Sequence, residues 1–236
     1  MCYRLVEVVN KSSLKIGNGR NLGHVTSYAL EITNDLSNNF IIIDKNFVFY
    51  KDFDNNYHLI DYIGNEAFVV LPNTSYNYKI NAGAFYTRAS INHIQFSSKV
   101  TNIGEAAFCE CVGLQEVYIP KNIEQLGTDV FVRCQGLISV KIDKDSKLTT
   151  LPPSTFQACN NLKYVIIPKS IETVGGNVFT LCDKVTLFYY GTAEEWTKVS
   201  LGLQSGFSAE IYFYSETKPS VNGSYWHMVN GEPVVW

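Results

Sequence analysis

Cysteine is the residue of this chain whose type and spacing could most readily do chemistry. Four cysteines recur at a nearly fixed interval; they are Cys111, Cys134, Cys159 and Cys182. Residues at one repeat position stack in a column, at the ~4.8 Å spacing of neighbouring strands. That spacing falls within the ~4.4–6.8 Å Cα separation of a disulfide, so disulfides are compatible with it. The interpretation we favour is a column of reduced thiols that pack as small buried apolar side chains.

The residues that could bind a metal ion or catalyse a reaction form weaker patterns than the cysteine column. Cys109 and Cys111 form a Cys-x-Cys pair, but residues two apart on a helical turn do not face each other. The four histidines are His24, His58, His93 and His227. Their positions match no metal-ligand spacing, and the chain lacks the HExxH and GxSxG motifs. The sequence therefore predicts no metal site, no cofactor and no enzyme.

The cysteine column is one position of a longer repeat. Between residues 103 and 119 the recurring apolar positions are Ile103, Phe108, Cys111, Leu114, Val117 and Ile119. The same skeleton surrounds the other three cysteines, and one period upstream Arg88 stands where the cysteine is expected. A fixed period in the twenties is typical of a stacked solenoid, in which each unit covers the apolar face of its neighbour.

Each repeat divides into two halves. Residues 103–111 carry apolar side chains at spacings of three and four, which suits a short helix or turn. Residues 114–119 end in the alternation of a strand, which Pro120 then terminates. We therefore predict an α/β repeat solenoid in which short convex helices or turns connect the strands of a parallel strand face.

Three regions follow from this pattern. Residues 1–79 read as a β-rich N-terminal segment or capping layer, and residues 80–190 as an array of five units, the last truncated. Residues 191–236 read as a C-terminal cap. In the cap, Thr192 begins a capping box, and Asn230-Gly231 joins two apolar runs as in a hairpin.

The strand face supplies the candidate binding residues. Because side chains alternate along a strand, inward Val117 and Ile119 leave Glu116 and Tyr118 pointing outward. Carrying this alternation through the array at a constant period gives two outward columns. The first column is His93, Glu116, Ser139, Tyr164 and Leu187; the second is Gln95, Tyr118, Lys141, Ile166 and Tyr189.

From these columns we select eight candidate binding residues, which are His93, Glu116, Tyr118, Lys141, Tyr164, Ile166, Leu187 and Tyr189. The C-terminal half of the face is rich in aromatic and apolar groups, and exposed clusters of this kind often mark interaction sites. The alternative is that β-propensity alone placed aromatic residues on the strands, or that the cap or the N-terminal segment covers them.

Composition excludes several classes of protein. The chain has 236 residues, 46% hydrophobic and 17% charged, with a net charge of −3, so it can bury a core. Its basic residues are not clustered as nucleic-acid binding requires. No segment approaches the ~20 apolar residues of a membrane span. Residues 1–9 lack the apolar region and cleavage site of a secretory leader, so either the protein stays in the cell or its leader is missing from this sequence.

The repeat unit, Ile/Leu-x4-Phe-x2-Cys-x2-Leu-x2-Val-x-Ile-Pro with Gly104 and Gly127 after the first apolar position, resembles the BspA-type leucine-rich repeat family over residues 80–190. Residues 189–196 and 211–219 resemble the ends of many such proteins from gut Firmicutes. The resemblance implies a non-catalytic binding module, secreted or attached to the cell surface, in a family linked to adhesion. The absence of a leader and an anchoring sequence leaves a cytoplasmic location as the alternative.

Two binding hypotheses follow. In the first, the strand face recognises a protein partner, such as a host or neighbouring-cell surface protein. In the second, the C-terminal aromatic residues Tyr225, Trp226 and Trp236 stack on sugar rings of a carbohydrate; a packed cap is the alternative interpretation of these residues. An enzyme would need a pocket with convergent polar groups, which the sequence does not display.

Overall fold

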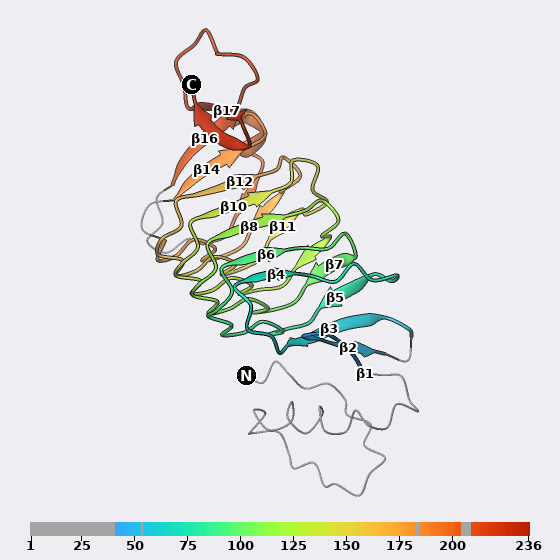
Figure 1. The fold of residues 1–236 in the computed structure, drawn as a ribbon. Helices are drawn as coiled ribbons and strands as arrows, with labels where there is room; N and C mark the ends of the chain where they lie inside the picture. Colours follow the sequence, from blue (N-terminus) through green and yellow to red (C-terminus); the bar gives the residue numbers. More distant parts are fainter. Residues whose placement is uncertain (1–40, 53, 183–184, 204–208) are drawn as a thin grey trace, which may run out of the picture.

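The structure, a computed structural model, describes residues 41–52, 54–182, 185–203 and 209–236. The described part is a solenoid whose turns stack from the N-terminal to the C-terminal end (Figure 1). Almost all of its regular structure is β-strand, and the one helix of the described residues is α2 (Ala193–Trp196). Cys2, His24 and the rest of residues 1–40 lie outside the described residues.

Nine strands form the main sheet, which runs along the whole stack. In spatial order they are β4 (Phe68–Val70), β6 (His93–Gln95), β8 (Glu116–Ile119), β10 (Ser139–Ile142), β12 (Tyr164–Ile167), β14 (Thr186–Tyr189), β16 (Glu210–Tyr214), β17 (Tyr225–Val229) and β18 (Glu232–Val235). All neighbours from β4 to β17 pair in parallel, and β18 pairs antiparallel with β17. The predicted parallel strand face is therefore confirmed.

Two further sheets form a second wall. One sheet has the order β1 (Ile41–Asp44), β2 (Phe47–Lys51), β3 (Tyr57–Tyr62), β5 (Tyr78–Ile80), β7 (Val100–Ile103) and β9 (Gln125–Leu126). The other has the order β11 (Thr150–Leu151), β13 (Thr173–Val174) and β15 (Ser200–Leu201). The stack extends past residues 80–190 at both ends, since β4 pairs with β6 and β16 pairs with β14.

The core between the two walls contains a ladder of phenylalanine rings. The ladder consists of Phe85, Phe108, Phe131, Phe156 and Phe179, one from each turn. Successive ring centroids are 4.8, 5.5, 5.7 and 5.8 Å apart, with interplanar angles of 9–17°. Tyr62 precedes Phe85 in this ladder at 5.3 Å. The repeat positions that the sequence marks as scaffold are thus the positions that bury the core.

For the convex segments, predicted as short helices or turns, the helix alternative is wrong, because these segments are turns. In the unit around Phe108, Ala106 and Glu110 have left-handed backbone conformations, with φ of 50° and 60°. An α-helix cannot continue through such residues. Instead of bonding within a helix, the N–H groups of Ala106, Phe108 and Glu110 donate to carbonyl oxygens of the next turn, at 2.8–2.9 Å. The apolar spacing of three and four comes from these consecutive turns.

Close contact between turns explains the glycine of the repeat. A Cβ atom on Gly127 would lie 2.3 Å from the backbone nitrogen of Glu105 in the preceding turn. Gly127→Ala should therefore lower the free energy of unfolding by about 1–3 kcal/mol, the usual cost of overpacking. Gly176→Ala is the matched control, since its Cβ would make only an ordinary 3.5 Å contact with the Leu203 oxygen. Denaturant unfolding of both variants tests this; equal stability of the two would contradict it.

The C-terminal predictions are confirmed in their local structure. The Thr192 side chain accepts a hydrogen bond from the Glu195 backbone and the Glu195 carboxylate accepts one from the Thr192 backbone, which makes the capping box of α2. Strands β17 and β18 form a hairpin through Asn230 and Gly231, whose φ angles of 51° and 83° match a type I′ turn.

Candidate functional site

The outward strand face is the set of main-sheet side chains that point away from the core. Strand register aligns them in two columns. The first column is Phe68, His93, Glu116, Ser139, Tyr164 and Thr186; the second is Val70, Gln95, Tyr118, Lys141, Ile166 and Phe188. Six of the eight candidate residues therefore point outward as predicted.

The predicted outward orientation of Leu187 and Tyr189 is wrong. Both belong to the core, and each is only 2% exposed. Strand β14 pairs Leu187 with Val165, so that Thr186 and Phe188 take the outward positions. The segment that leads into this strand is one residue shorter than in the other repeats, and a one-residue slip reverses every side chain. Thr186 is the most polar residue of the strand, and a polar residue is expected at an outward position. It was therefore the sequence feature that indicated the correct register.

The C-terminal half of the outward strand face is covered by the β17–β18 hairpin. Ile166 and Phe188 point outward but are only 1% and 6% exposed. Trp226 of β17 is fully buried against them, with its ring 5.4 Å from that of Phe188. Its indole nitrogen donates a 3.0 Å hydrogen bond to the Tyr189 carbonyl oxygen. For this half of the face, the alternative that the cap covers the aromatic residues is confirmed.

The tip of the hairpin is held by polar contacts. Lys141 donates hydrogen bonds to the Glu232 carboxylate and, at 2.9 Å, to the Gly231 carbonyl oxygen. Tyr164 donates to the other Glu232 oxygen at 2.6 Å. The hydrogen bond from Lys141, followed by that from Tyr164, lowers the pKa of Glu232. This contact therefore stabilises the fold above the ordinary carboxyl pKa and is lost as the pH falls through the lowered value.

No described residue covers the N-terminal half of the face, which we call the open half. Phe68, Val70 and Tyr118 are 59%, 51% and 52% exposed. His93 and Gln95 on β6, and Glu116 on β8, are also exposed. Phe68 and Val70 were not among the residues predicted from the sequence, because residues 1–79 lay outside the predicted array. Their signal was the Val-x-Leu-Pro ending of residues 69–72, which matches the end of a repeat.

Within the open half, Tyr118 and Phe68 are held in place by neighbours. The Tyr118 hydroxyl donates to the Asp143 carboxylate. Burial, and then this hydrogen bond, raise the pKa of Tyr118 to about 12, so the hydroxyl remains a neutral donor. The Phe68 ring lies 5.8 Å from the ring of His93. The surface is thus aromatic, with an acidic residue, Glu116, beside it.

The cysteine column consists of buried thiols, as favoured from the sequence. The thiols of Cys111, Cys134, Cys159 and Cys182 each donate to a phenylalanine carbonyl oxygen of the preceding turn, at 3.0–3.1 Å. Burial raises the pKa of Cys111 to about 12 and that of Cys134 and Cys159 well above the ordinary value. A small side chain with one donor therefore suits this position.

These thiols should resist alkylation in the native protein. At about pH 8, close to the ~8.5 pKa of a free thiol, an accessible cysteine reacts with iodoacetamide through its thiolate. We expect Cys111, Cys134, Cys159 and Cys182 to remain unmodified until the chain is unfolded in guanidinium. Peptide mass spectrometry before and after unfolding measures this. Modification of these four at the rate of a model thiol would contradict their placement.

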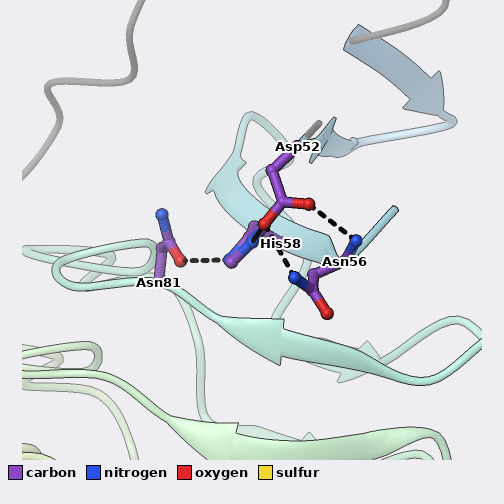
Figure 2. A network of polar contacts seen from close by, with 4 residues as sticks. All are labelled: Asp52, Asn56, His58 and Asn81. Atoms are coloured by element: carbon purple, nitrogen blue, oxygen red, sulfur yellow. Dashed lines mark hydrogen bonds and ion pairs between the residues drawn. The ribbon is translucent and has the colours of Figure 1, made fainter. Parts of the chain in front are cut away.

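One polar network resembles catalytic machinery but provides no nucleophile. Figure 2 shows Asp52, Asn56, His58 and Asn81 together. Asp52 accepts two hydrogen bonds from Asn56, and its carboxylate lies 3.1 Å from His58 Nε2. His58 Nδ1 lies 3.1 Å from the Asn81 side-chain oxygen. The side-chain hydrogen bond from Asn56 is the largest cause that lowers the pKa of Asp52, to about 2.

Both ring nitrogens of His58 thus face oxygen acceptors, and neither contacts a described hydroxyl or thiol. The network ties the β2–β3 hairpin to the segment after β5. Elsewhere in the part of the chain that the structure describes, no group of three His, Cys, Asp or Glu residues could hold a metal ion. No helix of those residues is long and apolar enough to cross a membrane.

The aromatic residues of the carbohydrate hypothesis, Tyr225, Trp226 and Trp236, mostly pack against other residues of the chain. Trp226 is buried and offers no ring face. Trp236 stacks on His227 with centroids 3.7 Å apart, and its indole nitrogen donates to the Ser215 carbonyl oxygen. Tyr225 is half-buried. These residues pack the C-terminal end and do not form an open row of rings.

Comparison with known proteins agrees with this architecture. The T. pallidum leucine-rich repeat protein matches 72% of this chain and 86% of its own, with 21% identity and a TM-score of 0.55. A leucine-rich repeat protein from Eubacterium ventriosum matches 82% of this chain, with 18% identity and a TM-score of 0.58; the match spans 54% of that protein. These likenesses show the fold alone.

No curated protein matches the chain significantly. The family model described as "BspA type Leucine rich repeat region" matches residues 78–198 in six copies, which is half of the chain. These residues include the phenylalanine ladder, the cysteine column and strands β5 to β14. The chain therefore belongs to the BspA-type leucine-rich repeat family, whose repeats build a solenoid that serves in general as a binding module.

Proposed function

We propose that the chain is a non-catalytic binding module that recognises a protein partner through the open half of the outward strand face. The observation that carries this proposal is the exposure of Phe68, Val70 and Tyr118 on one face of the main sheet. The chain covers the equivalent apolar residues of the other half, Ile166 and Phe188, with its own hairpin. Exposed apolar groups that share one face, with polar neighbours, often mark protein contact sites.

The candidate residues take different parts in this proposal. His93, Glu116 and Tyr118 lie within the open half and would contact the partner directly. Lys141 and Tyr164 hold the hairpin tip and so form the border of the site. The remaining three, Ile166, Leu187 and Tyr189, are buried, so they would contribute through the fold.

The family resemblance supports a secreted or surface-attached protein, with a host or neighbouring-cell surface protein as its partner. The buried or stacked positions of Trp226 and Trp236 give the carbohydrate alternative no further support. Rings that bind sugars need an accessible face, and Phe68 and Tyr118 of the open half are more exposed than Trp226 and Trp236.

The test compares two double variants. Phe68→Ser/Tyr118→Ser removes the aromatic groups of the open half. Leu181→Ser/Leu201→Ser is the matched control, because both leucines are exposed and lie away from the main sheet. Each immobilised protein is exposed to extracellular-matrix and neighbouring-cell extracts, and the retained proteins are quantified. We expect the open-half variant alone to lose roughly tenfold or more of a specific partner, since aromatic anchors typically contribute ~2 kcal/mol or more. Equal retention by both variants would refute the proposal.

A further inference from the structure

The chain itself adds strands at two of three sheet ends in the described structure, and the third end differs. At the C-terminal end of the main sheet, the chain adds the β17–β18 hairpin. At the N-terminal end of the second wall, it adds β1 and β2 to β3. The N-terminal end of the main sheet is different, because β4 pairs only with β6 among the described strands. One end of the main sheet is therefore an open edge.

The main chain of β4 alternates between its neighbour and the open side. The Ala67 oxygen accepts from His93, and the Leu71 nitrogen donates to Gln95, so residues 67, 69 and 71 face β6. The N–H and C=O groups of Phe68 and Val70 therefore point to the open side. No described residue bonds to these four groups.

The side chains of the same two residues are also available. Phe68 and Val70 are more than half exposed on the outward strand face, whereas Val69 between them is buried in the core. An edge that offers unpaired main-chain groups beside apolar side chains is a template for an added strand.

The opposite edge of the main sheet, strand β18, contains a residue that hinders the pairing of a further strand, and β4 has no such residue. In β18, the Trp236 nitrogen donates to Tyr225 of β17, so residues 234 and 236 face inward and Pro233 faces the free side. Proline has no N–H group, and its presence on an edge hinders further pairing. Strand β4 has the sequence Phe-Val-Val, with neither proline nor charge. The two edges thus differ in their capacity to accept a strand.

We propose that the open edge of β4 binds an extended segment of the protein partner by strand addition. This inference rests on the proposed function and specifies how the partner binds. The segment would donate to the oxygens and accept from the nitrogens of Phe68 and Val70. Its own apolar side chains, at alternate positions, would pack beside Phe68 and Val70 on the outward strand face. The contact continues the parallel ladder that already joins β4 to β16.

A partner protein fits this site better than a second copy of the chain. Two copies joined edge to edge through β4 would extend the sheet sideways and leave its outward face uncovered. Tyr118 lies two strands in from the edge, roughly 10 Å away at the usual strand spacing. A partner that adds a strand and also covers the face reaches both Val70 and Tyr118.

The test uses a backbone change at the edge. Val70→Pro removes the outward-pointing N–H group of β4 and keeps the β4–β6 bonds, which come from other residues. Val70→Ala is the matched control, since it shortens the side chain and keeps the N–H group. Circular dichroism and thermal unfolding establish that both variants are folded. The probe is a phage-displayed library of random linear peptides selected on the wild-type chain.

We expect the selected peptides to bind the wild type and Val70→Ala, and to bind Val70→Pro roughly tenfold or more weakly, a loss of ~1.4 kcal/mol. In the wild type, their binding should also slow amide hydrogen exchange at Phe68 and Val70, measured by NMR. The exchange measurement does not depend on the folding of the proline variant. Peptides that bind without protecting these amides, or a selection that yields no binder, would overturn strand addition.

Other outcomes identify a different occupant. Concentration-dependent dimerisation in sedimentation, lost in Val70→Pro, would assign the edge to a second copy and overturn the proposal. Protected Phe68 and Val70 amides in the free protein would assign it to the chain's own residues, with the same consequence. If binding depends on Phe68→Ser/Tyr118→Ser but not on Val70→Pro, strand addition fails while the open half remains a binding surface. If neither variant changes binding, both proposals fail.

Discussion

Replacing Trp226 with alanine should release the β17–β18 hairpin from the outward strand face. Trp226 is fully buried, and its ring packs against those of Phe188, Tyr190 and Tyr214. The substitution also removes the hydrogen bond to the Tyr189 carbonyl oxygen. Truncation of a buried tryptophan typically costs about 3–5 kcal/mol. We expect a loss of this size in guanidinium unfolding, together with increased binding of an apolar dye as Ile166 and Phe188 become exposed.

The matched control is Trp236→Ala. Trp236 is 39% exposed and stacks on His227 at the end of the hairpin, so its truncation leaves no cavity in the core. Its cost should stay within about 1 kcal/mol. The ion pair of Lys141 with Glu232 also contributes little, because the Glu232 side chain is 58% exposed and exposed pairs contribute about 0–1 kcal/mol. Equal losses in the two tryptophan variants, or unchanged dye binding in Trp226→Ala, would show that Trp226 does not anchor the hairpin.

This anchoring is the feature of the site that sequence reasoning could not supply. Asn230 and Gly231 predict the hairpin, because their backbone conformations are a local property. Nothing within residues 225–235 specifies which surface Trp226 contacts. The answer depends on the aromatic groups of β14 and β16, which are distant in sequence. The same contact decides which half of the outward strand face stays open. The binding surface that we propose therefore lies in the N-terminal half, whereas the sequence pointed to the C-terminal half.

Two predictions were wrong for local reasons: the outward orientation of Leu187 and Tyr189, and the convex helices. A constant repeat period placed Leu187 outward, although Thr186 breaks the apolar run and marks the outward position. The convex turns resembled helices, because the left-handed residues that interrupt them, such as Ala106 and Glu110, are not glycine. Their N–H groups find partners only in the next turn, so a single repeat gives no sign of them. The scaffold positions were predictable from the sequence. Every turn buries an apolar side chain at the same positions, so apolar residues recur there at a fixed interval.

Phe131→Ala should have the largest effect among substitutions in the repeat core. Phe131 is fully buried in the middle of the phenylalanine ladder, 5.5 Å from Phe108 and 5.7 Å from Phe156 between ring centroids. Truncation removes both stacking contacts and leaves a cavity, at a cost of about 3–5 kcal/mol. Because each turn of a solenoid is stabilised by its neighbours, the loss weakens the contacts on both sides of the altered turn.

Two measurements separate this effect from a local one. Guanidinium unfolding gives the total loss, and hydrogen exchange shows where protection falls. We expect reduced protection of the main-chain amides in the turns of both Phe108 and Phe156. Phe68→Ala is the matched control, since the same truncation on the open half creates no cavity and should cost within about 0.5 kcal/mol. If Phe131→Ala were no more destabilising than Phe68→Ala, the ladder could not be what couples one turn to the next, and the stability of the stack would have to come from its strand pairing alone.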